Sequence, residues 1–292
     1  MRTIRNARKS VELDETTIQD FDTELARMES PATGPVAVEE IAGQTGPTEA
    51  NGSSKSDATL LPASLLAGCR RNNWVSDPDM TIVFGGKGLS RGAEEFRSLR
   101  SRLCNMQKQQ NLKSILVASA LPGEGRSFVA VNLAQVLALQ PGCRVLLIDA
   151  DLRNPRLHSA FGTSSAPGFS EYLQQGADEL EVMQRGRTDN LFLIPCGRPV
   201  QQDHSELVAN GRLQLLIDQM EPLFDWIIID SPPAIAVTDA CLLADCCDGV
   251  LLVVRSHSTP FDVVRKARGR FREESLVGVV LNKIDTEASP KV

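Results

Sequence analysis

The segment that constrains the fold most is residues 114–128, S-I-L-V-A-S-A-L-P-G-E-G-R-S-F. An aliphatic run typical of a buried strand leads into a turn with Gly123 and Gly125, and a helix signal follows. The two glycines let the backbone curl so that several N–H groups point into one hollow, beside the positive N-terminal end of the helix. The segment therefore predicts a phosphate-binding loop. It departs from the usual G-x-x-x-x-G-K-[ST] pattern because Ala120 and Arg126 stand where glycine and lysine are usual.

Strand and helix signals alternate after this loop. Short runs of Val, Ile and Leu without polar alternation are typical of strands that are covered on both faces. The predicted strands are 144–149, 190–195, 226–230, 249–254 and 277–281, with helices such as 211–221 and 261–271 between them. This alternation predicts an α/β fold with a doubly wound, mostly parallel sheet.

The composition divides the chain into three parts. Residues 1–80 are rich in acidic residues, Thr, Pro and Gly, and we expect them to be largely disordered. Residues 81–112 contain a helical segment, and residues 113–292 form the phosphate-loop domain. The boundaries rest on composition and periodicity alone.

A polar helix is predicted over residues 90–110. Three apolar side chains recur on one face at helical spacing: Phe96, Leu99 and Leu103. Three charged side chains follow at steps of three on a neighbouring face: Glu94, Arg97 and Arg100. On composition alone, these charges indicate weak ion pairs on a solvated helix surface.

Two predicted strands end in aspartate. Asp149 ends one strand and Asp151 follows it, while Asp230 ends another strand and precedes two prolines. The carboxyl ends of parallel strands gather at one sheet edge, where ligands bind. Mg²⁺ is usually held by one or two carboxylates together with nucleotide phosphates and water, and the Ser127 hydroxyl is a further ligand. We expect a Mg²⁺ site with ligands Ser127, Asp149 and Asp230, and Asp149 or Asp151 to activate an incoming hydroxyl.

The nucleotide itself is expected at the loop and at the end of the last strand. The predicted binding residues are Pro122, Gly123, Glu124, Gly125, Arg126, Ser127, Phe128 and Asn282. At the last of these positions the residues leave two readings of equal weight: a hydrogen bond to a purine base edge, or local turn chemistry at a strand end. Asp239, at the predicted start of a helix, is better explained as a helix cap.

The bulk composition excludes some classes of protein. A net charge of −6 argues against a general nucleic-acid binder. The sequence contains no apolar run of the roughly 18 residues that a membrane helix needs. Seven cysteines without metal-ligand spacing indicate reduced thiols, so we expect a cytoplasmic protein.

Taken together, these residues resemble the bacterial tyrosine kinases that regulate capsule and exopolysaccharide synthesis, often called BY-kinases. The resemblance covers roughly residues 92–285 and rests on several motifs together. They are Pro122–Gly125, Asp149–Arg153, Gly168–Leu173, Asp230–Pro233 and Gly278–Asn282.

The resemblance implies a phosphate-loop NTPase of the partition-ATPase-like class that uses ATP and Mg²⁺ to phosphorylate tyrosine. It implies catalytic roles for Arg126, Asp149, Asp151 and Asp230. It also implies ring-shaped homo-oligomers built through the helix motif E-x-x-R-x-x-R, here Glu94, Arg97 and Arg100. The expected partner is a separate membrane regulator of polysaccharide chain length, which would hold the protein peripherally at the inner face of the membrane.

Two departures from the family pattern bear on activity. Arg126 replaces the loop lysine, and arginine is planar and forked rather than a compact point charge. The sequence has a single tyrosine, Tyr172, and no tyrosine cluster in its tail, so the expected acceptor is a partner protein. One alternative is a catalytically impaired pseudokinase that acts as a scaffold for the membrane regulator. Another is a partition-type ATPase. Such ATPases usually carry a further lysine at the start of the loop, and the presence of Ala120 and Leu121 there argues against this alternative.

Overall fold

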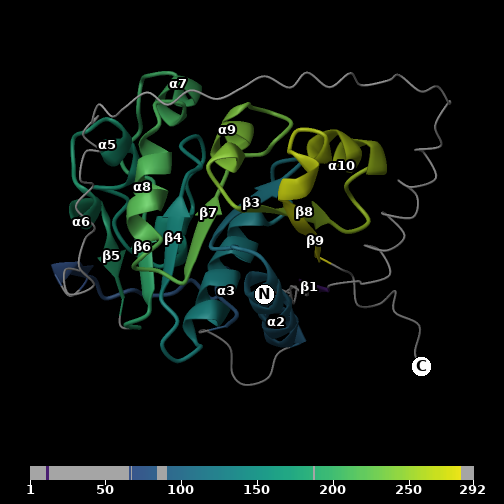
Figure 1. Cartoon of the computed structure of the whole chain (residues 1–292), viewed down its shortest axis with the longest axis horizontal. Helices are drawn as coiled ribbons and strands as arrows, with labels where there is room; N and C mark the ends of the chain where they lie inside the picture. The colour runs from purple at the N-terminus through teal and green to yellow at the C-terminus, as the bar shows by residue number, and fades with distance from the viewer. Residues whose placement is uncertain (1–10, 13–65, 67, 84–90, 187, 284–292) are drawn as a thin grey trace, which may run out of the picture. The chain divides into compact units, whose positions relative to one another are not determined.

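A nine-stranded sheet runs through the described part of the chain, in the order β1-β9-β8-β3-β7-β4-β6-β5-β2 (Figure 1). Six neighbouring strands are parallel: β3 (Ser114–Ser119), β4 (Val145–Asp149), β6 (Leu191–Ile194), β7 (Trp226–Asp230), β8 (Gly249–Arg255) and β9 (Leu276–Asn282). Three two-residue strands extend the edges: β1 (Val11–Glu12), antiparallel to β9, β5 (Gln184–Arg185), antiparallel to β6, and β2 (Arg70–Arg71), parallel to β5. The predicted mostly parallel α/β sheet is confirmed.

This computed structural model describes residues 11–12, 66, 68–83, 91–186 and 188–283. All of the described residues belong to one compact unit. The disorder expected for residues 1–80 falls mostly outside the described ranges.

Helices cover both faces of the sheet (Figure 1). They are α2 (Arg91–Gln109), α3 (Arg126–Ala138), α4 (Leu157–Ala160), α5 (Phe169–Leu173), α6 (Glu179–Val182), α7 (His204–Val208), α8 (Arg212–Met220), α9 (Asp239–Asp245) and α10 (Phe261–Arg268). Along β3, Ile115 and Val117 join the apolar layer under α2 and α3, while Leu116 and Ala118 join the layer under α8 and α9. Successive strand residues face opposite layers, so each central strand must be apolar throughout.

Helix α2 packs on α3 through the predicted apolar stripe. Phe96 is fully buried, Leu99 and Leu103 are nearly so, and the rings of Phe96 and Phe128 lie 6.0 Å apart between centroids. The segment 91–109 is therefore part of the core layer of this domain and not an appended helix. The apolar face of α2 packs against α3, the helix that follows the glycine loop.

The segment just before residue 80 packs on the domain, although the sequence placed it in the disordered region. The Trp74 and Phe161 rings lie 4.7 Å apart, and the Val75 N–H donates to the Phe161 carbonyl. The Ile82 N–H donates to Asn132 Oδ1 on α3 at 2.8 Å. The sequence does not predict these contacts, because the segment is polar in composition and its hydrogen-bond partners are distant in sequence. Residues 74–82 therefore contact the domain, and the boundary at residue 80 stays a prediction.

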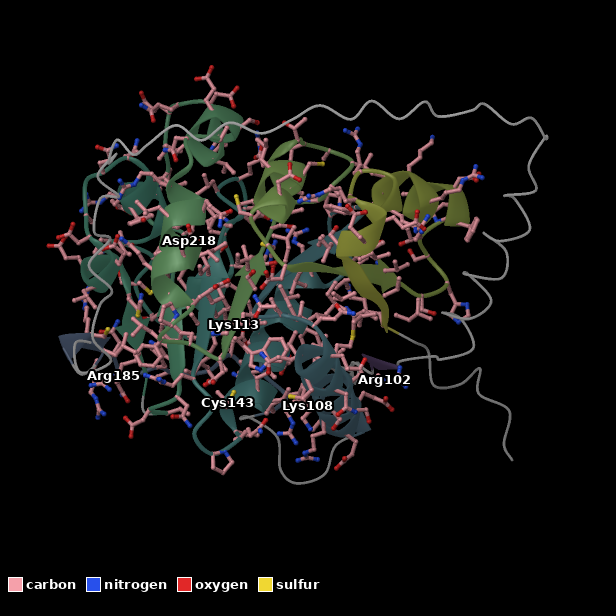
Figure 2. All side chains as sticks on the ribbon, in the orientation of Figure 1. Arg102, Lys108, Lys113, Cys143, Arg185 and Asp218 are labelled. Carbon is pink, nitrogen blue, oxygen red and sulfur yellow. The ribbon has the colours of Figure 1, made fainter. Side chains whose placement is uncertain are left out.

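All seven cysteines lie in the described ranges and are free thiols, as expected. Burial, together with the neighbouring charge of Asp225, raises the pKa of Cys143 (labelled in Figure 2) to about 12. Within the ranges that the structure covers, no helix is long and apolar enough to cross a membrane.

Candidate functional site

The loop between β3 and α3 has the backbone that phosphate binding requires. Gly123 and Gly125 have φ values of +82° and +96°, in the left-handed region that favours glycine. A Cβ atom on Gly125 would lie 1.9 Å from the side-chain amide nitrogen of Asn282. The second glycine is therefore needed both for its conformation and for the close approach of β9. Helix α3 begins at the next residue, so its N-terminal end faces the loop.

The side chain of Glu124 connects the glycine loop to the end of β8 and the segment after it through hydrogen bonds. Its side chain is buried, and its carboxylate accepts a hydrogen bond from the Leu121 N–H at 2.6 Å. The other carboxylate oxygen accepts from the Thr259 hydroxyl and from the Arg255 N–H. The side chain of Glu124 therefore holds the shape of the loop, and a nucleotide contact by this residue stays a prediction.

Two residues at the end of β9 also donate hydrogen bonds to carbonyls of this loop. The side-chain amide of Asn282 donates to the Glu124 carbonyl at 2.8 Å, and Lys283 Nζ donates to the Gly123 carbonyl at 2.9 Å. Asn282 is almost fully buried, and its Oδ1 accepts from the Lys283 N–H. The Oδ1 contact is local turn chemistry, one of the two sequence readings, whereas the amide contact joins two segments distant in sequence. The base contact stays a prediction.

Three aspartates converge at the carboxyl edge of the sheet. Strand β7 lies between β3 and β4, and Asp230 is the register partner of Asp149 on the neighbouring parallel strand. Asp149 and Asp230 are fully buried, and Asp151 is 2% exposed. The sheet topology thus brings together the acidic residues that the sequence singled out.

Burial of these like charges changes their protonation. Burial raises the pKa of Asp230 to about 6, although Arg126 and the Ser127 hydroxyl oppose the rise. Burial and the neighbouring Asp230 raise the pKa of Asp149 well above its ordinary range, while the Leu157 and Arg156 N–H groups oppose this rise. Without a further cation, the cluster therefore favours retaining protons.

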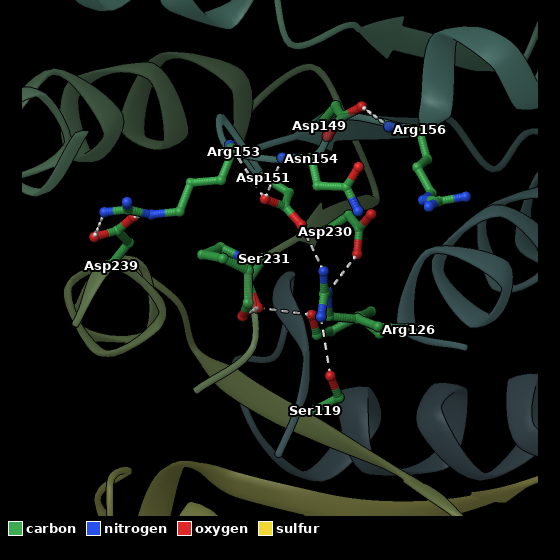
Figure 3. Close-up of polar contacts among 12 residues, drawn as sticks. Ser119, Arg126, Asp149, Asp151, Arg153, Asn154, Arg156, Asp230, Ser231 and Asp239 are labelled. Carbon is green, nitrogen blue, oxygen red and sulfur yellow. Dashed lines mark hydrogen bonds and ion pairs between the residues drawn. The ribbon is translucent and has the colours of Figure 1, made fainter. Parts of the chain in front are cut away.

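Arg126 lies inside this acidic cluster (Figure 3). Its Nη2 donates to Asp151 at 2.6 Å, its Nε donates to Asp230 at 3.2 Å, and its Nη1 donates to the Ser119 hydroxyl at 2.9 Å. The side chain is only 8% exposed. A lysine has no planar fork with which to bridge these three acceptors in this way. In this structure the arginine acts as the counter-ion of the aspartates.

A second arginine near the edge is also held by a carboxylate. Arg153 donates through Nε and Nη2 to the two oxygens of Asp239, at 2.9 and 3.3 Å, and Ser205 donates to the same carboxylate. The helix-cap prediction for Asp239 was wrong, because Thr238 occupies the cap position and Asp239 is the first residue of α9. Its carboxylate instead ties the loop after β4 to α9 and α7.

The acidic cluster has donor atoms suited to Mg²⁺. Asp149 Oδ1 and Asp230 Oδ2 are buried and accept no hydrogen bond from the residues that the structure describes. No group of three or more His, Cys, Asp or Glu side chains in those residues forms a metal site by itself. Mg²⁺ does not require one, because phosphates and water complete its shell. The residues therefore fit a Mg²⁺ ion held by Asp230 and Ser127, with Asp149 beside them.

The loop and Asp151, one of the three aspartates, line one cavity of about 470 Å³. Most predicted site residues line it: Pro122, Gly123, Gly125, Arg126, Ser127, Phe128, Asp151 and Asn282. The same wall contains residues that the sequence reading left out: Arg153, Asn154, Arg156 and Lys283. A cavity of this size is typical of small-molecule sites. The missed residues follow the ends of β4 and β9, so a search of all strand ends would have found them.

Three predicted site residues, Glu124, Asp149 and Asp230, are buried and do not line this cavity, and neither do the predicted residues of α2. On α2, Arg97 pairs with Glu94, and Arg100 Nη1 donates to the Val136 carbonyl of α3 at 3.0 Å. Their role in oligomers stays a prediction. Tyr172 is fully buried, under the guanidinium of Arg212, and burial raises its pKa to about 12. Its hydroxyl is therefore a poor phosphate acceptor in the folded protein.

Comparison with known proteins agrees with the fold and the motifs. Residues 112–262 match the family model described as an AAA domain. The chain is 33% identical over 214 residues to tyrosine-protein kinase YwqD of Bacillus subtilis, covering 73% of this chain and 90% of the relative. It is 32% identical over 195 residues to tyrosine-protein kinase CpsD of Streptococcus agalactiae, covering 66% of this chain and 82% of that protein.

A solved structure is similar over the same region. The kinase domain of the Escherichia coli tyrosine kinase ETK superposes with a TM-score of 0.63 at 29% identity, covering 69% of this chain and 79% of that one. Sequence and fold comparisons thus select the same group of proteins. The chain belongs to the family of bacterial tyrosine-protein kinases, built on an AAA-type nucleoside-triphosphatase domain.

Proposed function

We propose that the protein binds ATP with Mg²⁺ and phosphorylates tyrosine on a partner protein in exopolysaccharide or capsule production. One observation carries the proposal: the glycine loop and the N-terminal end of α3 line one cavity, and Arg126 on its wall contacts Asp230, a buried carboxylate with one unpartnered oxygen. Loop N–H groups bind phosphate oxygens, and carboxylates hold the accompanying cation. Family membership supports the choice of tyrosine kinase chemistry.

The residues have separate roles in this proposal. The backbone of residues 122–127 and the N-terminal end of α3 bind the phosphates, and the Ser127 hydroxyl and Asp230 hold Mg²⁺. When bound, Mg²⁺ neutralises the phosphate charge that grows during transfer. Asp149 is proposed as the proton acceptor for the incoming tyrosine hydroxyl, because its Oδ1 accepts no hydrogen bond from the described residues and the carboxylate lies beside Asp230. Asp151 keeps Arg126 in position.

The partner and the assembly follow from the family resemblance. We propose that a separate membrane protein that regulates polysaccharide chain length holds the kinase at the inner face of the membrane. Glu94, Arg97 and Arg100 on α2 are proposed to contact neighbouring copies in a ring. The exposure of Glu94 and the partial exposure of Arg97 support this, since their ion pair lies at the surface.

A pseudokinase scaffold is the second candidate function. The observation that favours it is the position of Arg126, whose guanidinium is already engaged by three acceptors inside the protein. Phosphoryl transfer depends on positioned positive charge. A protein of this design would bind nucleotide and assemble with its partner but transfer phosphate slowly.

Transfer of labelled phosphate separates these two functions. The full chain is incubated with [γ-³²P]ATP, Mg²⁺ and a tyrosine-containing polymer, alongside Arg126→Lys and Asp230→Ala. Transfer by the parent that Asp230→Ala abolishes supports the kinase. Nucleotide binding without transfer, and a gain of transfer in Arg126→Lys, supports the scaffold. Absence of nucleotide binding in the parent contradicts both.

A further inference from the structure

Four cationic side chains line the cavity: Arg126, Arg153, Arg156 and Lys283. Three of them have defined partners inside the protein. Arg126 is bound to two aspartates, Arg153 to Asp239, and Lys283 to a loop carbonyl. Among the residues that the structure describes, these four are the candidates for the charge that a loop lysine would place on the outer phosphates.

Arg126 is poorly placed to supply that charge. Each of its three guanidinium nitrogens donates to a different acceptor, two of them buried carboxylates. Moving it onto a phosphate would leave the buried Asp151 without its counter-ion, which is strongly unfavourable. Arg126 therefore lines the cavity, but its guanidinium is engaged by acceptors inside the protein.

Arg156 is in the opposite situation. Its backbone N–H and that of Leu157 donate to Asp149 Oδ2, at 3.1 and 2.9 Å, which fixes the main chain beside the acidic cluster. Its side chain is exposed on the cavity wall, and its guanidinium forms no hydrogen bond or ion pair with any described residue (Figure 3). The main chain of Arg156 is therefore held in place by a hydrogen bond, while its guanidinium has no partner among the described residues.

We propose that Arg156 binds the terminal phosphate of the nucleotide and supplies the charge that the loop lysine supplies in the usual motif. The inference rests on the proposed function, since it assigns a ligand within the same cavity. An arginine fork pairs with two phosphate oxygens at once, so it suits a terminal group with three free oxygens. In this chain the positive charge has moved from the loop to the segment after β4.

The test is the ratio of the ADP and ATP dissociation constants, measured with Mg²⁺ by titration calorimetry on the full chain. Arg156→Gln should weaken ATP binding about tenfold or more and change ADP binding less than about threefold, the loss expected for one charge-assisted contact. Arg156→Lys should restore part of the ATP preference. Arg70→Gln, an exposed arginine on edge strand β2, is the matched control and should leave both constants unchanged.

A second variant, Arg126→Met, tests whether the loop arginine determines the preference for ATP over ADP. It should lower the thermal midpoint because it leaves buried carboxylates unpaired, yet keep the preference for ATP over ADP in the folded fraction. Loss of that preference in Arg126→Met together with an unchanged ratio in Arg156→Gln would overturn the assignment and return the role to the loop. A parent that binds neither nucleotide would instead refute the proposed function itself.

Discussion

Replacing Asp230 with asparagine should stabilise the metal-free protein while removing its capacity to hold Mg²⁺ and nucleotide. Asp230 is fully buried next to Asp149, its register partner on β4. Asparagine has nearly the same shape and retains an acceptor oxygen for Arg126 Nε. The substitution thus removes a buried negative charge without opening a cavity.

The gain can be estimated from the pKa. Burial raises the pKa of Asp230 from an ordinary 3.8 to about 6. Each pKa unit is worth about 1.4 kcal/mol, so ionising this carboxylate in the folded protein is about 3 kcal/mol less favourable than in the unfolded chain. The weakened ion pair with Arg126 offsets part of this, although Asp151 remains a partner. We expect a net stabilisation of about 1–3 kcal/mol near pH 7.5.

The sign of the pH dependence follows from the same difference. The folded protein holds the Asp230 proton more tightly than the unfolded chain, so the contribution of this group to stability falls as the pH rises from about 4 to about 6. The advantage of Asp230→Asn should therefore be full above pH 7 and small near pH 4.5.

Urea denaturation of both proteins in EDTA, at pH 7.5 and pH 4.5, measures this effect. Asp218→Asn removes an exposed carboxylate from α8 (labelled in Figure 2) and is the charge-matched control. It should change stability little at either pH. Equal destabilisation by Asp230→Asn at both pH values would show that the attraction of Arg126 outweighs burial, and the reasoning would be wrong.

Three further predictions concern the loop, the core and the bridge between helices. Gly125→Ala should abolish nucleotide binding in equilibrium dialysis, because the added Cβ would lie 1.9 Å from the side-chain amide nitrogen of Asn282. Circular dichroism should show that the fold is retained. Normal nucleotide binding would contradict this account of the loop. Phe96→Ala should lower the unfolding free energy by about 3–5 kcal/mol in urea, because it empties a buried site under α2; a loss below about 1 kcal/mol would mean that α2 is not part of the core. Burial alone raises the pKa of Asp239, but hydrogen bonds from Arg153 and Ser205 lower it overall. The parent should therefore lose stability below about pH 4, and Asp239→Asn should show less of this acid-dependent loss; equal acid slopes would contradict the bridge.

The sequence predicts the sheet well because its central strands are buried on both faces. Runs such as Trp226–Asp230 contain the information locally, and that strand has the predicted bounds. The convergence of Asp149 and Asp230 is also predictable, because parallel strands present their carboxyl ends at one edge. Adjacent strand ends and a glycine turn are features that short stretches of sequence encode.

Side-chain pairing across the fold is not encoded in this way. The sequence indicates that Arg126 replaces a lysine, but its contact with Asp151 depends on how two loops meet after folding. The bond from Asn282 to Glu124 joins residues 158 positions apart. The docking of Trp74 on Phe161 likewise depends on a surface that exists only in the folded domain. Such pairings decide which charges face the cavity, and only the structure shows them.

Titration calorimetry of the full chain with ATP, with and without Mg²⁺, tests the central claim most directly. The parent should bind one ATP per chain in a saturable reaction that is weaker without Mg²⁺, and Asp230→Ala should lose the Mg²⁺-dependent part. Asp218→Ala should behave like the parent. Absence of binding in the parent, or binding that Asp230→Ala leaves unchanged, would contradict the assignment of this sheet edge as a Mg²⁺-nucleotide site.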